Sequence, residues 1–150
     1  MPIQEEQVAQ HNETYNAIIA AYKVMQHNIS KMLLEERLTL PQFQALKIVA
    51  KCGATPMKVI SEEMLVTPAN ITGIIDRLES EGLIKRNVRE GDRRTTIIEL
   101  TLKGGALQER VATKYSEFVQ NALRVFTIEE QTRLRELLAK LQEGMSQSEG

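Results

Sequence analysis

The chain has 150 residues, a length that suits one compact domain or one domain with appended helices. Hydrophobic residues make up 42% of it, which is enough for a packed core and excludes a disordered tail. The formal net charge is -1 and shows no overall basic excess, so a nucleic-acid-binding function would require a local patch of positive charge.

The sequence shows no signal for export or for membrane insertion. Its first residues, MPIQEEQVAQHNE, lack the basic and apolar regions of a secretory signal, and no stretch approaches the roughly 20 apolar residues that span a bilayer. Cys52 is the only cysteine, which excludes an internal disulfide and fits a reducing cytosol. We therefore expect a cytoplasmic protein with no membrane partner.

The first strongly periodic segment covers residues 8–32. Its seam residues alternate steps of three and four, as expected along one face of a helix. They are Val8, His11, Tyr15, Ile18, Tyr22, Met25, Ile29 and Met32. No glycine or proline interrupts the pattern, so we predict one long helix.

The next helix is predicted from its two ends. Thr39 and Gln42 have the spacing of a capping box, and Pro41 is tolerated in a first helical turn. Phe43 falls on the inward face of this helix. Gly53 is expected to end it as a C-cap.

Two further helix starts follow closely. Thr55-Pro56 and Thr67-Pro68 each place a threonine N-cap before a proline at the first helical position. The two predicted helices are joined by Leu65-Val66, which is the spacing of a helix-turn-helix. Leu65 stands where many such turns have glycine, so we expect a less tight turn here. Gly82 then ends the second helix as a left-handed cap.

A hairpin follows the second helix. Segments 83–88 and 95–100 are rich in β-branched residues and flank a polar break that contains Gly91-Asp92. Between residues 84 and 94 there are five cations and two anions, a local charge of +3, which leaves -4 for the rest of a chain whose total is -1. Positive charge is therefore concentrated on this hairpin, which we interpret as a wing.

Two helical segments complete the chain. Thr101 is placed to cap a long helix, and Thr127 with Glu130 forms a strong capping box for the last one. The predicted fold class is mainly α with a small β-hairpin wing, as a winged helix-turn-helix flanked by N- and C-terminal dimerisation helices. The winged helix-turn-helix covers residues 39–101. Residues 4–37 plus 102–145 form the helical dimerisation region of the same intertwined chain.

The flanking helices carry long apolar stripes that the middle block cannot cover. A second copy of the chain is the simplest cover, so we predict a homodimer. The residues expected at this interface are Val8, Ile18, Tyr115, Phe118, Leu134, Leu137, Leu138 and Leu141.

The helix that begins after Thr67 presents small and polar residues outward. Such a face lets the helix approach base edges in a DNA major groove. Asn70 can pair with adenine, Arg77 can reach guanine or a phosphate, and Ala69 or Thr72 can contact a thymine methyl. The major-groove candidates are Thr67, Pro68, Ala69, Asn70, Thr72, Gly73 and Arg77. An ordinary amphipathic helix with a solvated face is the competing interpretation.

The charge of the wing favours DNA over that interpretation. Arginine at a hairpin tip suits a minor groove, where the potential of DNA is most negative. We expect Asp92 to hold the guanidinium of Arg94 in place. The candidates for minor-groove and phosphate contact are Lys85, Arg86, Arg89, Asp92, Arg93 and Arg94.

Two stretches of the sequence resemble the MarR family of winged-helix regulators. One is the wing pattern with Asp92, Arg94, Leu100 and Thr101, and the other is Asp76-Arg77-Leu78-Glu79-Ser80-Glu81-Gly82-Leu83-Ile84. The resemblance covers essentially the whole chain, including the flanking helices. It implies an obligate dimer on a pseudo-palindromic operator, with recognition helices in successive major grooves and wing arginines in the flanking minor grooves. Many members are repressors released by small amphipathic, often phenolic or anionic, ligands bound between the two regions of each subunit.

Other site types find less support. Tyr15, Tyr22, Met25 and Phe43 are weak candidates for a ligand pocket, and a dimer core is the simpler explanation for them. Cys52 is expected to be a packing residue rather than an oxidant sensor, because the oxidant-sensing branch of the family has its cysteine in the first helix.

No catalytic constellation is present in the sequence. His11 and His27 lie far apart, so no metal site is expected, and no cofactor or enzymatic activity is predicted. A winged-helix module that docks another protein is the alternative function. The absence of Phe and Tyr from the exposed face of the predicted recognition helix argues against it.

Overall fold

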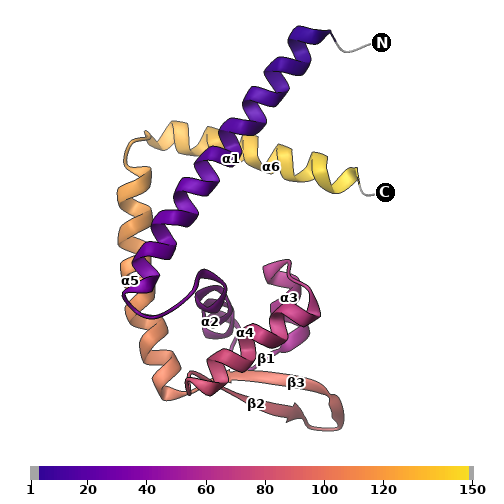
Figure 1. Cartoon of the computed structure of the whole chain (residues 1–150), viewed down its shortest axis with the longest axis vertical. Helices are drawn as coiled ribbons and strands as arrows, with labels where there is room; N and C mark the ends of the chain where they lie inside the picture. The colour runs from indigo at the N-terminus through magenta and orange to yellow at the C-terminus, as the bar shows by residue number, and fades with distance from the viewer. Residues whose placement is uncertain (1–3, 149–150) are drawn as a thin grey trace. The chain divides into compact units, whose positions relative to one another are not determined.

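The computed structural model describes residues 4–148 and confirms a mainly helical winged-helix fold (Figure 1). The helices are α1 (Glu5–Leu34), α2 (Leu40–Cys52), α3 (Met57–Met64), α4 (Pro68–Ser80), α5 (Leu102–Leu123) and α6 (Ile128–Gln147). The strands are β1 (Thr55–Pro56), β2 (Ile84–Arg89) and β3 (Asp92–Leu100). No helix of the described part is both long and apolar enough to cross a membrane.

The chain packs as two compact units. The first extends to Ala112 and contains α1, the winged helix-turn-helix and the first half of α5, and the second begins at Thr113 and contains the rest of α5 and α6. This boundary differs from the one predicted from the sequence, which separates residues 39–101 from the flanking helices by function. The functional division remains a prediction.

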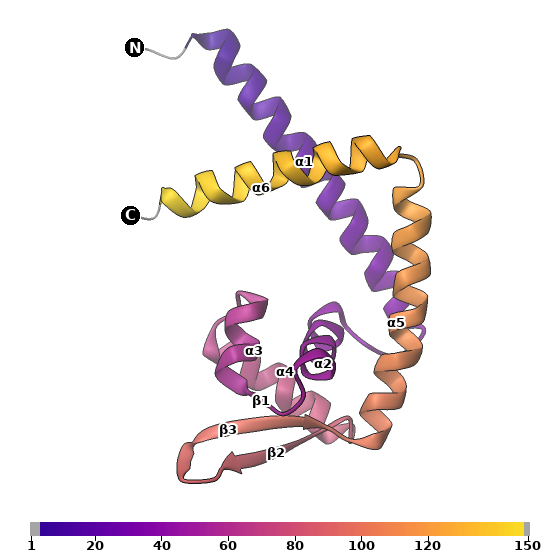
Figure 2. The same cartoon turned by 180° about the vertical axis from the view of Figure 1, so that it is seen from behind.

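The winged-helix core lies between three helices and a small sheet. The sheet is antiparallel in the order β1-β3-β2, with α2, α3 and α4 on one side of it (Figure 1). The β2–β3 hairpin extends beyond these helices, as is also visible from behind in Figure 2. Fully buried side chains of α2, α3, α4, β3 and the loop after α4 form the core, including Phe43, Leu46, Ile60, Ile75, Leu78, Leu83 and Ile98.

The predicted helix starts at Thr39, Thr67 and Thr127 are confirmed. Thr39 and Thr127 both form complete capping boxes, and the Thr67 side chain accepts a hydrogen bond from the backbone N–H of Asn70. Each bond satisfies an N–H group that the helix itself leaves without a partner. Gly53 closes α2, and its N–H donates to the carbonyl of Val49 at 2.9 Å.

The helix start predicted at Thr55-Pro56 is wrong. These two residues form β1 and pair with β3 in the register Thr55↔Ile98 and Pro56↔Ile97. The Thr55 hydroxyl donates to the carbonyl of Gly53 at 2.6 Å, so it does not cap α3. Threonine and proline fit a sheet edge as well as a helix start, since an edge strand tolerates the missing N–H of proline. The long-range pairing with β3 decides the outcome.

Three helices end with a residue in the left-handed conformation. Arg37, Leu65 and Gly82 have φ values of 56°, 53° and 73° after α1, α3 and α4. In each case the following residue donates its N–H five residues back; that of Val66, for example, reaches the carbonyl of Ser61 at 3.0 Å. This is the Schellman arrangement, which satisfies the last carbonyls of a helix. The expected looser turn at Leu65 is therefore wrong, because leucine adopts the conformation that glycine would take.

The outer helices bury little of their own surface. Leu33 is the one buried residue among the described residues of α1, and none of those of α6 is buried. The α6 residues Leu134, Leu137, Leu138 and Leu141 are all exposed. These helices therefore carry apolar faces that the single described chain leaves in contact with solvent.

The start of α5 lies unusually close to the loop that follows α4. The backbone N–H of Thr101 donates to the carbonyl of Leu83 at 3.1 Å, and the Thr101 hydroxyl donates to the carbonyl of Gly82 at 2.6 Å. A Cβ atom added at Gly104 would overlap the carbonyl oxygen of Leu83 and lie 2.7 Å from its carbonyl carbon. We call these four residues the α4–α5 junction. Its geometry requires glycine at position 104.

Replacing Gly104 by alanine is expected to lower the free energy of unfolding by about 1–3 kcal/mol, because α5 must move away from the Leu83 backbone. The adjacent Gly105→Ala change is the matched control. A Cβ at Gly105 has no heavy atom within 4 Å, so better helix propensity should raise the same free energy by about 0.5–1 kcal/mol. Urea unfolding of both variants at one protein concentration measures the difference. Equal effects of the two changes would show that the close approach is not a constraint.

Candidate nucleic-acid interface

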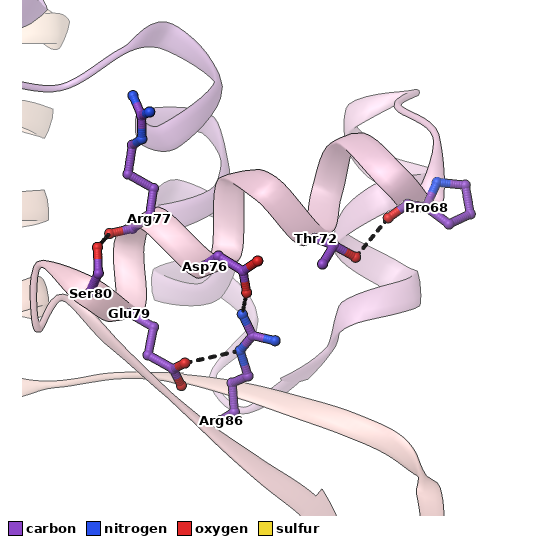
Figure 3. Close-up of polar contacts among 7 residues, drawn as sticks. All are labelled: Pro68, Thr72, Asp76, Arg77, Glu79, Ser80 and Arg86. Carbon is purple, nitrogen blue, oxygen red and sulfur yellow. Dashed lines mark hydrogen bonds and ion pairs between the residues drawn. The ribbon is translucent and has the colours of Figure 1, made fainter.

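Helix α4 presents one apolar and one polar face. Ile71, Ile75 and Leu78 are buried against the core. The opposite face is exposed, and it contains every residue predicted to enter a major groove: Thr67, Pro68, Ala69, Asn70, Thr72, Gly73 and Arg77. Thr72 donates its hydroxyl to the carbonyl of Pro68 at 2.9 Å (Figure 3). The helix therefore offers small and polar groups along its outer face, with its N-terminus and the partial positive charge of its dipole at one end.

A groove of about 670 Å³ runs along one side of this face. Asn70, Gly73, Ile74 and Arg77 line it from α4, and residues of α2 and of the turn before α4 form its other wall. Arg77 has no side-chain ion pair or hydrogen bond among the described residues, and its guanidinium points away from Arg86 (Figure 3). A side chain in this position is available to a ligand outside the protein.

The wing is a hairpin with an irregular tip. β2 and β3 pair from Ile84↔Leu100 to Val88↔Thr96, and the register shifts between Val88 and Arg89. At the tip, the Asp92 carboxylate accepts hydrogen bonds from the Thr95 hydroxyl at 2.7 Å and from the backbone N–H of Arg94 at 3.0 Å. These bonds, that of Thr95 first, hold the pKa of the Asp92 carboxyl below its ordinary value.

The expectation that Asp92 holds the guanidinium of Arg94 is therefore wrong. Asp92 fixes the backbone of the tip and leaves the Arg94 side chain without a carboxylate partner among residues 4–148. The sequence could not distinguish these two bonds, because a carboxylate two residues before an arginine can reach either its N–H or its guanidinium.

The five wing cations fall into two groups. Lys85 lies 3.2 Å from Glu99, and Arg86 pairs with Asp76 and Glu79 of α4. Arg89, Arg93 and Arg94 form no ion pair within the described residues. The positive charge of the wing is consequently concentrated at its tip, on fewer side chains than the sequence predicted.

A second groove, of about 560 Å³, separates the wing from α4. Arg89, Arg94, Thr95 and Thr96 line it from the wing, and Pro68, Ile71 and Thr72 line it from α4. The remaining lining residues come from the segment 56–61. Two arginines at the side of an open groove suit an extended anionic chain, since guanidinium groups bind phosphate oxygens.

The candidate ligand-pocket residues do not share one environment. Tyr15, Tyr22 and Met25 are exposed on α1, whereas Phe43 is 2% exposed in the winged-helix core. Phe43 is therefore a core residue, and a ligand pocket lined by these four residues stays a prediction. Cys52 is exposed, so the packing role predicted for it is wrong.

One ion pair near the end of α1 has no signal in the sequence. Arg110 of α5 donates to Oε2 of Glu36 through Nη2 at 2.9 Å and through Nε at 3.3 Å. The two residues lie 74 positions apart, so no local pattern joins them. Thr95 and Thr96 of the α4–wing groove also escape prediction as site residues, because β-branched residues there fit a strand without any ligand.

Comparison with known proteins gives a consistent result. The family model described as "MarR family" matches residues 38–96. The chain is 31% identical to the HTH-type transcriptional regulator PecS of Dickeya dadantii (strain 3937) over 118 residues, which cover 76% of this chain and 70% of PecS.

Two solved structures share the fold. One is a MepR-like protein complexed with pseudoligands, at 33% identity and a TM-score of 0.68, covering 87% of this chain and 92% of that one. The other is the C80S mutant of MarR from E. coli complexed with operator DNA, at 22% identity and a TM-score of 0.78, covering 84% and 91%.

A winged-helix core with an exposed recognition helix, an arginine-tipped wing, and similarity to PecS over most of both chains all support one assignment. Proteins of this kind are transcriptional regulators and not enzymes. The chain belongs to the MarR family of DNA-binding transcriptional regulators.

Proposed function

We propose that this regulator binds a pseudo-palindromic operator as a homodimer and acts as a repressor. In each subunit, α4 enters a major groove and the wing tip enters the neighbouring minor groove. The observation that carries this proposal is that Arg89 and Arg94, which form no ion pair within the described residues, line the groove beside the small-residue face of α4.

The two elements have different tasks in this proposal. Asn70 and Arg77 read base edges, since asparagine pairs with adenine and arginine with guanine in a major groove. Arg89, Arg93 and Arg94 supply phosphate and minor-groove contacts, which provide affinity more than sequence preference. The groove between α4 and the wing accommodates the phosphodiester backbone that separates the two DNA grooves. The DNA complex of E. coli MarR, which has the same fold, supports this placement.

Lys85 has a lesser role than its charge suggests. It lies opposite Glu99 in the β2–β3 register and forms an ion pair with that carboxylate. The side-chain amide of Asn87 donates a hydrogen bond to the same carboxylate. Side chains alternate between the two faces of a strand, so Lys85 and Asn87 lie on the face opposite to that of the buried Ile84. This is the side of the sheet away from α4, and we therefore exclude Lys85 from the DNA contacts.

A second copy of the chain is the proposed cover for the outer helices. The α6 stripe of Leu134, Leu137, Leu138 and Leu141 has the helical spacing of a helix–helix interface, and all four residues are exposed. On α1, Val8 is exposed and Ile18 is half-buried, and Tyr115 and Phe118 of α5 are also half-buried. A two-fold dimer would match the two-fold symmetry of a pseudo-palindromic operator.

Regulation by a small amphipathic or phenolic ligand is the remaining part of the proposal. The MepR-like relative complexed with pseudoligands supports a ligand-responsive mode of action. A cytoplasmic location fits a protein whose partner is DNA. Docking of another protein in place of DNA is the alternative, and the first experiment distinguishes the two.

That experiment is a selection from a pool of randomised duplexes, followed by fluorescence-anisotropy titration of the enriched sequences across a salt series. We expect an inverted repeat whose half-sites lie about one helical turn apart, and affinity that falls steeply with salt. Weak binding without sequence preference would contradict the proposal and favour a protein partner.

The change Arg94→Ala is expected to weaken binding to every duplex. Removing one phosphate-binding side chain from each subunit should reduce the slope of log K against log salt by about 2 per dimer. Lys85→Ala is the matched control, because Lys85 is already paired with Glu99 and lies on the opposite face of the wing. Its slope should remain that of the unchanged protein. If both variants lowered the slope equally, the division of the wing cations would be wrong.

The change Leu137→Glu is expected to dissociate the dimer, because it places a charge in the apolar stripe of α6. Sedimentation equilibrium should then give the mass of one chain, and operator affinity should be lost. The far-ultraviolet circular dichroism of the protein should still show a helical fold, because the winged-helix region stays folded. Leu102→Glu is the control, since Leu102 is 96% exposed at the start of α5 and lies outside the stripe. If the Leu137→Glu protein remained dimeric, the dimer interface would not include the apolar stripe of α6.

A further inference from the structure

Arg86 is set apart from the other wing cations by its surroundings. Its side chain is 27% exposed and lies between β2 and the C-terminal half of α4. Nη2 pairs with the carboxylate of Asp76, and Nε lies 3.4 Å from Oε1 of Glu79 (Figure 3). Nε is buried and has no hydrogen bond within the described residues, so the attraction of Glu79 is its main compensation.

The pleat of β2 explains why Arg86 points toward α4. Arg86 lies directly opposite Ile98 in the register, and Ile98 is completely buried. Ile84, two residues before Arg86, is buried as well. Residues two apart share one face of a strand, so Arg86 occupies the core side of the wing while Lys85 occupies the other. Asp76 and Glu79 are three residues apart on α4, which puts both carboxylates on the same side of that helix.

The negative charges of Asp76 and Glu79 are unfavourable near DNA, and Arg86 compensates part of them. Asp76 and Glu79 are exposed on the helix that is proposed to enter the major groove. Without a cation beside them, they would repel the DNA phosphates. The Arg86 guanidinium compensates part of that charge and at the same time ties the wing to α4.

We propose that Arg86 is a positioning residue for operator recognition and does not itself contact DNA. By holding β2 against Asp76 and Glu79, it sets the orientation of the wing relative to α4, so that both elements reach neighbouring grooves together. This inference rests on the proposed DNA-binding function and assigns to Arg86 a role different from that of Arg89, Arg93 and Arg94.

A positioning arginine and a phosphate-binding arginine differ in their salt dependence. Removing a phosphate contact lowers the salt slope, whereas removing a positioning contact lowers affinity and discrimination and leaves the number of released counterions unchanged. Arg86→Gln is therefore expected to weaken binding to the selected operator on the order of tenfold or more, with an unchanged salt slope. Binding to a random duplex should weaken less. Discrimination, which is the ratio of the affinity for the selected operator to the affinity for a random duplex, should therefore fall.

Further variants separate positioning from charge. Arg86→Lys keeps the charge but cannot form the planar fork, so it should retain random-duplex affinity and still lose discrimination. Adding Asp76→Asn and Glu79→Gln to Arg86→Gln removes the repulsion, which should restore random-duplex affinity without restoring discrimination. A salt slope lowered by Arg86→Gln as much as by Arg94→Ala would overturn the proposal, as would unchanged affinity and discrimination.

Hydrogen exchange on the protein without DNA provides a readout that does not depend on operator binding. Backbone amides of residues 84–100 should exchange faster in Arg86→Gln than in the unchanged protein, and Lys85→Gln should leave them unaffected. Equal exchange in Arg86→Gln and the unchanged protein would overturn the tie between wing and α4. If the chain failed to select any duplex, the proposed function would fail, while the exchange result would still decide whether Arg86 holds the wing.

Discussion

The close approach at the α4–α5 junction is the constraint on which the rest of the structure depends. At this junction the end of α4, the beginning of β2, the end of β3 and the first turn of α5 meet within a few residues. Thr101 bonds to the backbone of Gly82 and Leu83, and the Lys103 ammonium donates to the carbonyl of Glu81 at 2.8 Å. Because Gly104 has no side chain, α5 can touch the Leu83 peptide directly. The recognition helix, the wing and α5, which belongs to the proposed dimerisation region, are therefore held together at one place.

The distribution of ion pairs, more than the number of cations, determines where the protein can attract DNA. The chain as a whole is slightly acidic, and two of the five wing cations are balanced by carboxylates of the protein itself. What remains is the wing tip, whose backbone Asp92 holds through the N–H of Arg94 and not through the guanidinium of that residue. Pairing within the protein thus directs a modest positive charge to the edge of the groove beside α4.

Much of this architecture could be predicted from the sequence, because its signals are local. The capping boxes at Thr39 and Thr127, the helix end at Gly82 and the hairpin around residue 91 each depend on a few neighbouring residues. What the sequence could not predict depends on partners that only the fold brings together. Thr55-Pro56 becomes a strand because β3 lies alongside it, and Arg86 pairs with Asp76 and Glu79 because the fold places β2 beside α4.

The turn at Leu65 shows that exposure and freedom to vary are different properties. Leu65 is 94% exposed, so almost any side chain could be accommodated there by volume and polarity. Its backbone, however, lies in the left-handed region, where a β-branched residue is strongly disfavoured and proline is excluded by its fixed negative φ. Among related sequences, this surface position should therefore accept glycine, asparagine and unbranched side chains and should lack valine, isoleucine and proline. The constraint at this position is therefore on the backbone conformation, and the polarity and volume of the side chain are almost unconstrained.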